Sequence, residues 1–241
     1  MIVVKDEGPV RLITLSATER KNALSFDDLG DLKFAVSKTS RTDATRILVL
    51  TGEGDHFCAG FDLNEMRAAV VRPTAQRFAR DLQTEGSEIM QSLADPGVIS
   101  VAVLNGPALG GGAELACACD LRVASPTTYF EFRHASLGLT PAWGTVERLK
   151  SLVGGAHATR MLLLAARVEA QEAMAMGLVA QMWTGPALDW VHRHAPIFRT
   201  LNALTRMKAL LRTNDASAEA FAFLDLFGSQ EHRAVMATVK R

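Results

Sequence analysis

The sequence predicts an α/β fold whose strands are buried on both faces. Short apolar runs rich in β-branched residues alternate with amphipathic segments through the first half of the chain, a pattern typical of α/β proteins. The chain has 241 residues, 48% of them hydrophobic, which is enough to bury a substantial core. No Ser/Pro/Gly-rich linker divides it. We therefore expect residues 1–185 to form a core on which residues 186–241, helical in pattern, pack as an appendage.

Three segments are predicted strands. Residues 10–15 (VRLITL) have a strand's composition, and residues 45–52 (TRILVLTG) and 97–106 (GVISVAVLNG) are continuous apolar runs that end in glycine. Such uninterrupted runs are expected where a strand is covered on both faces. We place the latter two in the centre of the sheet.

Helices are predicted between and after these strands. Residues 22–39 have apolar side chains near helical spacing, with Asn22 or Ser25 placed as the N-cap. Residues 61–95 are polar, helical in composition and interrupted by Pro73, which predicts a mobile surface segment followed by a long helix. The chain from Trp143 onward predicts a helix, a Gly-Gly break, a second helix, and a third helix that ends at Gly177.

Composition excludes several function classes. Lys and Arg together number 26, as do Asp and Glu, and no basic cluster suits nucleic acid. The amino terminus lacks the pattern of a signal peptide, which predicts a cytoplasmic protein. The weakly polar stretch 98–119 is interrupted too often to cross a membrane. The spacing of Cys58, Cys117 and Cys119 matches neither a zinc site nor a redox C-x-x-C pair, so we expect them to be small buried side chains.

One carboxylate lies inside a glycine-rich, apolar stretch. The segment GPALGGGAELACACD, residues 106–120, contains Glu114 and follows a predicted strand. We expect a helix from about Ala113, whose first backbone N–H groups can face a ligand. The structural alternative is a tight turn in which Glu114 occupies the first helical turn and pairs with Arg122.

A second glycine loop raises the prospect of a shared site. In LTGEGDHFCAGFDL, residues 50–63, the Ala59-Gly60-Phe61 turn also lies beyond a predicted strand, where parallel sheets bind ligands. One N–H group from each loop, aimed at a single oxygen, would form an oxyanion hole. Neither loop is a nucleotide fingerprint, because Leu115 stands where G-x-G-x-x-G needs its last glycine and no P-loop is present.

These segments together resemble the enoyl-CoA hydratase/isomerase (crotonase) family. The matching stretches are ERKNALS, ILVLTGEGDHFCAGFDLNEM, VAVLNGPALGGGAELACACDLRVAS, LGLTPAWGTVERL and EAMAMGLV, which together cover most of the chain between residue 11 and about residue 180. The resemblance implies a ClpP/crotonase-like spiral of repeated ββα units. It also implies that the C-terminal helices pack on neighbouring subunits, in a homotrimer or a dimer of trimers.

The resemblance assigns provisional roles to individual residues. The backbone N–H groups of Phe61 and Gly111 would hold the thioester oxygen. Coenzyme A would contact the backbone of Ala59, Asp62 and Leu63, with Lys21 a candidate for its phosphates. Coenzyme A is part of the substrate in this family, so no separate cofactor is expected.

The implied acid–base pair departs from the family pattern. Glu114 stands directly after GGG-x, where family hydratases carry the glutamate that activates water. Their second glutamate, in F-x-x-P-E, falls on His134 when counted from Phe130. Imidazole exchanges protons near neutral pH and can substitute, although His134 can equally be an ordinary pocket residue. Strand alternation turns Glu131 away from the site, and we expect it to pair with an arginine.

The expected reaction is hydration of a 2-enoyl-CoA. Alternatives are isomerisation, decarboxylation or thioester hydrolysis through the same enolate-stabilising site, or acyl-CoA binding without catalysis. Trp143 replaces a residue that is usually small in the family, and it either lines the acyl pocket or packs in the core. With Phe61 it favours small, flat or branched acyl groups. The remaining histidines lack metal-ligand spacing, so no metal site is expected.

Overall fold

The computed structural model describes residues 1–38, 46–213 and 215–238. Its main sheet has the strand order β1-β2-β3-β4-β6-β9. β1 pairs antiparallel with β2, and every other neighbouring pair is parallel. The six strands are β1 (Ile2–Glu7), β2 (Val10–Leu15), β3 (Ile47–Gly52), β4 (Ile99–Leu104), β6 (Leu121–Ala124) and β9 (Gln181–Met182).

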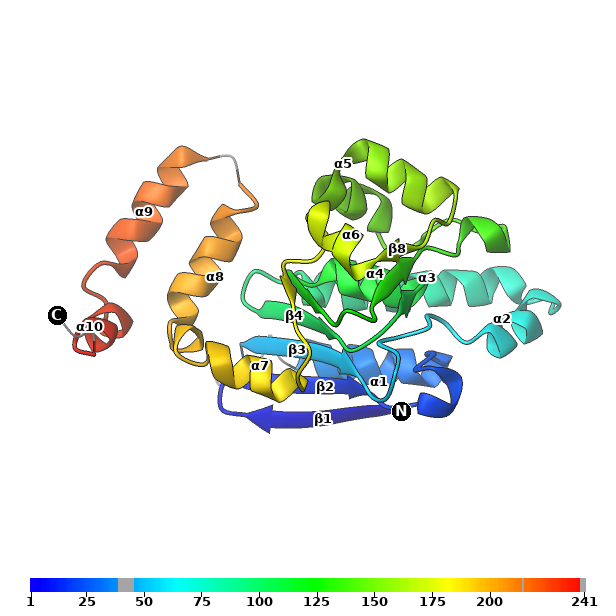
Figure 1. Cartoon of the computed structure of the whole chain (residues 1–241), viewed down its shortest axis with the longest axis horizontal. Helices are drawn as coiled ribbons and strands as arrows, with labels where there is room; N and C mark the ends of the chain where they lie inside the picture. Colours follow the sequence, from blue (N-terminus) through cyan, green and yellow to red (C-terminus); the bar gives the residue numbers. More distant parts are fainter. Residues whose placement is uncertain (39–45, 214, 239–241) are drawn as a thin grey trace.

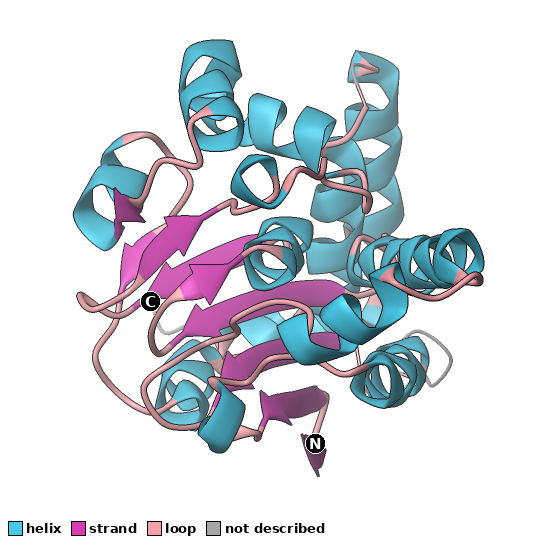
Figure 2. Ribbon diagram, turned by 90° about the vertical axis from the view of Figure 1, so that its right-hand side faces the viewer, coloured by secondary structure: helices cyan, strands magenta, loops and turns pink. Residues whose placement is uncertain are grey.

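The predicted strands are confirmed, and their apolar runs have a physical cause. Side chains alternate between the faces of a strand, and both faces of this sheet are covered (Figure 2). In β3, Leu48 and Leu50 pack with the helices of one face, while Ile47 and Val49 pack on the other face with helix α7 (Ala187–His194). No position in the middle of β3 therefore meets water. Residue 45, the first of the predicted strand, lies outside the described residues.

A second, three-stranded sheet carries part of the glycine-rich segment. Its order is β5-β7-β8, formed by β5 (Ala108–Leu109), β7 (Tyr129–Glu131) and β8 (Val168–Glu169). Isolated bridges join Cys58 to Ala108 and Leu24 to Phe61. The two glycine loops are thus tied together by backbone contacts.

Helices cover one face of the main sheet in the order that the sequence predicts. They are α1 (Phe26–Ser37), α2 (Leu63–Val70), α3 (Ala75–Leu93), α4 (Gly111–Ala118), α5 (Thr145–Leu163) and α6 (Ala170–Ala175). Ser25 caps α1 in a capping box with Asp28. The break predicted in α5 falls at Gly154, whose backbone is non-helical, and α6 ends shortly before Gly177. Residue 39, at the end of the first predicted helix, lies outside the described residues.

Two expectations about helices need correction. The segment predicted to be mobile contains the helix α2, because Asp62 accepts hydrogen bonds from Asn64 N and Glu65 N and so caps its first turn. The helix expected from about Ala113 begins two residues earlier, at Gly111. Pro73 does separate α2 from the long helix α3, as predicted.

The C-terminal segment is helical, as its pattern predicts. After α7, a short 3-10 turn (Ile197–Arg199) leads to α8 (Leu201–Leu210), α9 (Ala216–Leu226) and α10 (Gln230–Met236). Figure 1 shows α9 and α10 standing away from the sheet, at the end of the molecule opposite α2. The proposed division at residue 185 falls between β9 and α7 and stays a prediction. Within the described ranges, no helix is long and apolar enough to cross a membrane.

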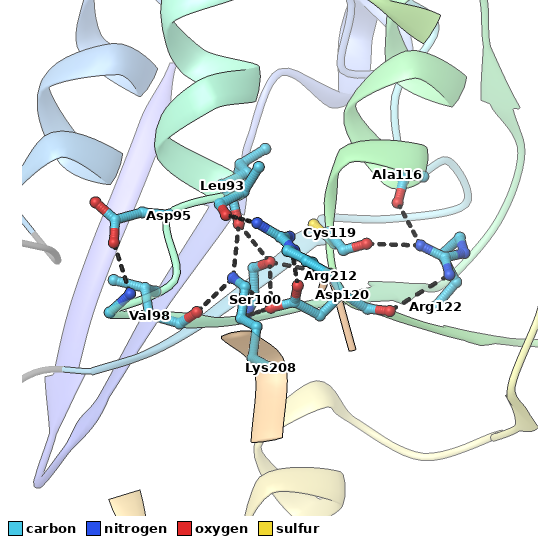
Figure 3. Close-up of polar contacts among 12 residues, drawn as sticks. Leu93, Asp95, Val98, Ser100, Ala116, Cys119, Asp120, Arg122, Lys208 and Arg212 are labelled. Atoms are coloured by element: carbon cyan, nitrogen blue, oxygen red, sulfur yellow. Dashed lines mark hydrogen bonds and ion pairs between the residues drawn. The ribbon is translucent and has the colours of Figure 1, made fainter. Parts of the chain in front are cut away.

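A buried ion pair fastens α8 to the core (Figure 3). Lys208 Nζ lies 2.7 Å from Asp120 Oδ2 and donates to the carbonyl oxygen of Val98. The same carboxylate oxygen accepts from Ser100 N at 2.8 Å, and Arg212 contacts the other oxygen. Asp120 therefore links the end of α4, the start of β4 and the C-terminal helices.

Candidate active site

Glu114 lies in the first turn of α4, in the centre of the molecule. Every residue of α4 from Gly112 to Ala118 is buried, and the side chain of Glu114 is only 2% exposed. A carboxylate in such a place requires a polar partner. That partner is His134.

The Glu114–His134 contact joins the two predicted acid–base residues. His134 Nε2 lies 2.7 Å from Glu114 Oε1. The contact is an ion pair when the imidazole carries its second proton. The remaining polar atom of each side chain, Glu114 Oε2 and His134 Nδ1, is buried and has no hydrogen-bond partner among the described residues. Buried polar atoms without partners are rare and often occur at functional sites.

The alternative pairing of Glu114 with Arg122 is wrong. The Arg122 guanidinium donates to the backbone carbonyl oxygens of Leu178, Cys119, Ala116 and Asp120. Figure 3 shows three of these four contacts beyond the carboxyl end of α4. Arg122 therefore caps the end of the helix opposite to Glu114, where a cation is favoured.

His134 does reach the site, but strand alternation is not the reason. β7 ends at Glu131, and His134 precedes a 3-10 turn (Ala135–Leu137), so alternation does not extend to residue 134. Glu131 pairs with an arginine as expected, because Arg133 Nε donates to its carboxylate at 2.9 Å. Glu131 and Arg133 nevertheless line the same cavity as Glu114, so Glu131 is not turned away from the site as expected.

The backbone N–H groups of Phe61 and Gly111 face no partner within the described residues. Gly111 is the first residue of α4, and Phe61 bridges to Leu24 through the backbone groups of its neighbours Gly60 and Asp62. A Cβ atom on Gly60 would lie 3.0 Å from Gly111 N and 2.8 Å from Leu109 O. The two loops therefore meet closely only because residue 60 is glycine, with φ of +90°.

Two buried or partly buried asparagines hold the first loop in place, and sequence reasoning missed both. Asn22 Nδ2 donates to the carbonyl oxygens of Glu53 and His56. Asn105 Nδ2 donates to those of Gly54 and His56, and its Oδ1 accepts from Gly52 N. The available signal was a lone amide at the end of an apolar strand, in the dipeptide Asn105-Gly106.

A cavity of about 460 Å³ opens beside these groups. Its volume suits a small-molecule site. Phe61, Gly111, Glu114, His134 and Trp143 line it, together with apolar side chains of α2 and α3. The cavity therefore brings together the predicted acid–base pair, the predicted oxyanion donors and the predicted acyl-pocket tryptophan.

The residues predicted to contact coenzyme A lie at and near one side of this cavity. Ala59 and Leu63 line it. The N–H groups of Ala59 and Asp62 are engaged by Lys21 O and Leu24 O, so of the three predicted backbone contacts only the N–H of Leu63 has no partner within the described residues. The side chain of Asp62 caps α2.

Lys21 is exposed beside this loop. Burial, and next the Lys21 ammonium, lower the pKa of His56 below its usual value.

The three cysteines are buried, as predicted. Burial raises the pKa of Cys58 and Cys119 to about 12 and that of Cys117 to about 11. The thiolate, which is the reactive form, is thus absent at neutral pH. These side chains act as small apolar residues.

The geometry supports proton transfer next to a polarised carbonyl. Two N–H groups without partners in the described residues, on loops that meet at Gly60, can donate to an oxyanion. A carboxylate with one free oxygen, held by an imidazole through the other, can accept a proton and return it. A bound acyl thioester would present its α- and β-carbons to that pair.

Comparisons with known proteins identify the family. The family described as enoyl-CoA hydratase/isomerase matches residues 5–219. A protein of Mycobacterium bovis called "Probable enoyl-CoA hydratase echA6" is 34% identical over 240 residues, which cover 96% of this chain and 92% of the relative.

Two solved structures extend the comparison. The enoyl-CoA hydratase of Bacillus anthracis is 26% identical with a TM-score of 0.86, and the match covers 98% of this chain and 94% of that one. The putative enoyl-CoA hydratase of Thermobifida fusca, solved in complex with CoA, is 27% identical with a TM-score of 0.81. That match covers 99% of this chain and 95% of the other.

Proposed function

The chain belongs to the enoyl-CoA hydratase/isomerase family, and on that premise we propose that it adds water across the double bond of a 2-enoyl-CoA. The observation that carries the proposal is the buried Glu114–His134 pair, which lies in one cavity with Phe61 and Gly111. The names of the Mycobacterium and Bacillus relatives support the same reaction.

In the proposed mechanism, the N–H groups of Phe61 and Gly111 hold the thioester oxygen. Water binds to Glu114 Oε2, which accepts one proton as the water oxygen bonds to the β-carbon. The electron pair of the double bond moves to the α-carbon and the thioester oxygen, where the oxyanion hole stabilises the charge. Glu114 then transfers this proton to the α-carbon. His134 holds Glu114 and shares the proton across their 2.7 Å contact.

Hydration is tested by mixing the protein with crotonyl-CoA and following the absorbance of the conjugated thioester, with products identified by mass. Loss of absorbance with a gain of one water supports the proposal. Free coenzyme A would indicate thioester hydrolysis, and a shifted double bond in a 3-enoyl-CoA would indicate isomerisation. Binding without turnover would indicate a non-catalytic acyl-CoA-binding protein, and loss of carbon dioxide from a carboxylated acyl-CoA a decarboxylase. Any of these without hydration contradicts the proposal.

Matched variants test the assigned residues. Glu114→Gln keeps the shape of the side chain and should lower kcat by about 10²–10⁴-fold. His134→Gln should also lower kcat, because Glu114 loses its imidazole partner. Glu131→Gln changes a carboxylate of the same cavity that Arg133 holds away from the pair, and kcat should not change. Equal effects of Glu114→Gln and Glu131→Gln would refute the assignment.

We also propose that the protein forms a homotrimer or a dimer of trimers through its C-terminal helices. Large apolar side chains are exposed on and after α9, with Phe221 70%, Leu224 68% and Phe227 66% exposed. Contiguous exposed apolar surface of this kind marks an interaction site. Sedimentation or light scattering gives the subunit number directly, and a monomer at micromolar concentration would contradict the assignment.

Coenzyme A is proposed to enter only as part of the substrate, with no separate cofactor and no metal. Within the described part of the chain, no group of three or more His, Cys, Asp or Glu side chains is arranged to hold a metal ion. Dialysis against a chelator should leave the rate of hydration unchanged. A cytoplasmic location also stays a prediction, tested by fractionating cells that produce the protein.

A further inference from the structure

Helix α3 forms one wall of the cavity, and that wall ends abruptly. Its lining residues, Ala75, Phe78, Ala79, Leu82 and Gln83, follow the spacing of a single helical face. The next position on this face is Gly86, which is buried but does not line the cavity. Another side chain therefore covers Gly86.

The side chain that covers Gly86 is the indole of Trp143. A Cβ atom on Gly86 would lie 1.9 Å from Trp143 Cε2 and 2.0 Å from Nε1. The ring therefore occupies the space that any other residue at position 86 would fill. Trp143 Nε1 donates to Leu82 O at 3.2 Å, which fixes the ring against the same helix.

The far edge of the indole reaches the proposed oxyanion hole. A Cβ atom on Gly111 would lie 2.8 Å from Trp143 Cζ3 and 2.9 Å from Cη2. Trp143 is 7% exposed, so the indole is almost fully buried. The indole is thus held between α3 and the first residue of α4.

Another part of the cavity wall is exposed to solvent. Val70, Leu137 and Leu139 line it there and are 64%, 49% and 48% exposed. An acyl thioester whose coenzyme A lies beside Ala59 and Leu63 would place its carbonyl oxygen at Gly111, next to the edge of the indole. The indole therefore bounds the cavity beside the proposed carbonyl position.

We propose that Trp143, seated on Gly86, is the end wall of the acyl pocket and restricts the enzyme to short acyl chains. This inference rests on the proposed function, because it assumes that an acyl-CoA occupies the cavity. Its substrate class is the short-chain 2-enoyl-CoA thioesters, such as crotonyl-CoA. Longer chains are excluded because their terminal methylenes meet a ring that is hydrogen-bonded to α3 and held between Gly86 and Gly111.

The test compares wild type, Trp143→Ala and Trp183→Ala on a series of 2-enoyl-CoA substrates from crotonyl- to decenoyl-CoA. Trp183 is the matched control, because its indole donates to Pro186 O away from the cavity. One methylene in a fitted pocket is worth about 10–200-fold in specificity. We expect Trp143→Ala to raise kcat/KM for decenoyl-CoA relative to crotonyl-CoA by about tenfold or more, and Trp183→Ala to leave the ratio unchanged.

Dissociation constants measured by calorimetry separate this inference from the proposed function. If wild type hydrates crotonyl-CoA but Trp143→Ala leaves the chain-length ratio unchanged in both kcat/KM and Kd, the acyl chain runs elsewhere and the inference is overturned. If no 2-enoyl-CoA binds or reacts, the proposed function fails, and the inference fails with it. If Trp143→Ala does not fold, Trp143→Phe keeps a buried ring and should give a smaller shift in the same direction, and an unchanged ratio would equally overturn the inference.

Discussion

Replacing Asp120 by asparagine tests how the C-terminal helices are fastened to the core. Lys208 is 5% exposed, and Asp120 is its only carboxylate partner among the described residues. In Asp120→Asn the ammonium keeps the carbonyl oxygen of Val98 at 2.5 Å and that of Leu93 at 3.5 Å, but loses its counter-charge. Removing one partner of a buried pair costs about 3–5 kcal/mol. Because the Asp120 side chain is 19% exposed and these carbonyl contacts remain, we expect about 3 kcal/mol.

The assay is urea unfolding followed by circular dichroism, at one fixed protein concentration because assembly would also contribute to stability. The double variant Asp120→Asn/Lys208→Met removes both charges and should recover more than half of the loss. A loss below about 1 kcal/mol in Asp120→Asn, or a double variant no more stable than the single one, would refute the reasoning.

The same pair predicts a pH dependence. Burial lowers the pKa of Lys208 below 10.5, although Asp120 acts in the opposite direction. Between that lowered pKa and 10.5 the unfolded chain binds more protons than the folded protein, so the contribution of Lys208 to the free energy of unfolding rises with pH. Losing Asp120 lowers the folded pKa further. The deficit of Asp120→Asn should therefore shrink as the pH is raised from 7 towards 10, and a constant deficit would contradict this.

Two further predictions concern the oxyanion hole and the assembly. Gly111→Pro removes one proposed donor at a helix position that tolerates proline. It should lower kcat by about 10²–10³-fold relative to Gly111→Ala, which keeps the N–H beside Trp143. Equal kcat values in these two variants would argue against Gly111 as a donor. Phe223→Asp and Phe227→Asp place charges on side chains that are 63% and 66% exposed, and should reduce the mass measured by light scattering without unfolding the core; an unchanged mass would place the subunit contact elsewhere.

Local patterns predicted the elements whose stability is local or set by burial. The strand β3 was recognisable because both of its faces are covered, which leaves no polar position in the middle of Ile47–Gly52. The start of α1 was recognisable because Ser25 completes its own cap with Asp28. The bounds of α2 were not predicted, because its cap, Asp62, also belongs to the glycine loop and the segment was expected to be mobile.

The site depends on contacts between distant parts of the chain, which periodicity does not encode. Gly86 and Trp143 are 57 positions apart, and only the folded structure shows that the glycine makes room for the indole. Asn22 precedes the first glycine loop in the sequence and Asn105 follows it, yet both side chains donate to His56 O in that loop. The Glu114–His134 pair was anticipated through a family resemblance, and the turn after β7, rather than strand alternation, brings His134 to the carboxylate.

The most direct measurement of the central claim is the reaction of crotonyl-CoA in deuterium oxide, with the product examined by NMR and mass spectrometry. The account predicts 3-hydroxybutyryl-CoA with one solvent deuterium on the α-carbon, formed at least about 10²-fold more slowly by Glu114→Gln. Recovery of unchanged crotonyl-CoA from the wild-type protein, or equal rates in wild type and Glu114→Gln, would contradict it.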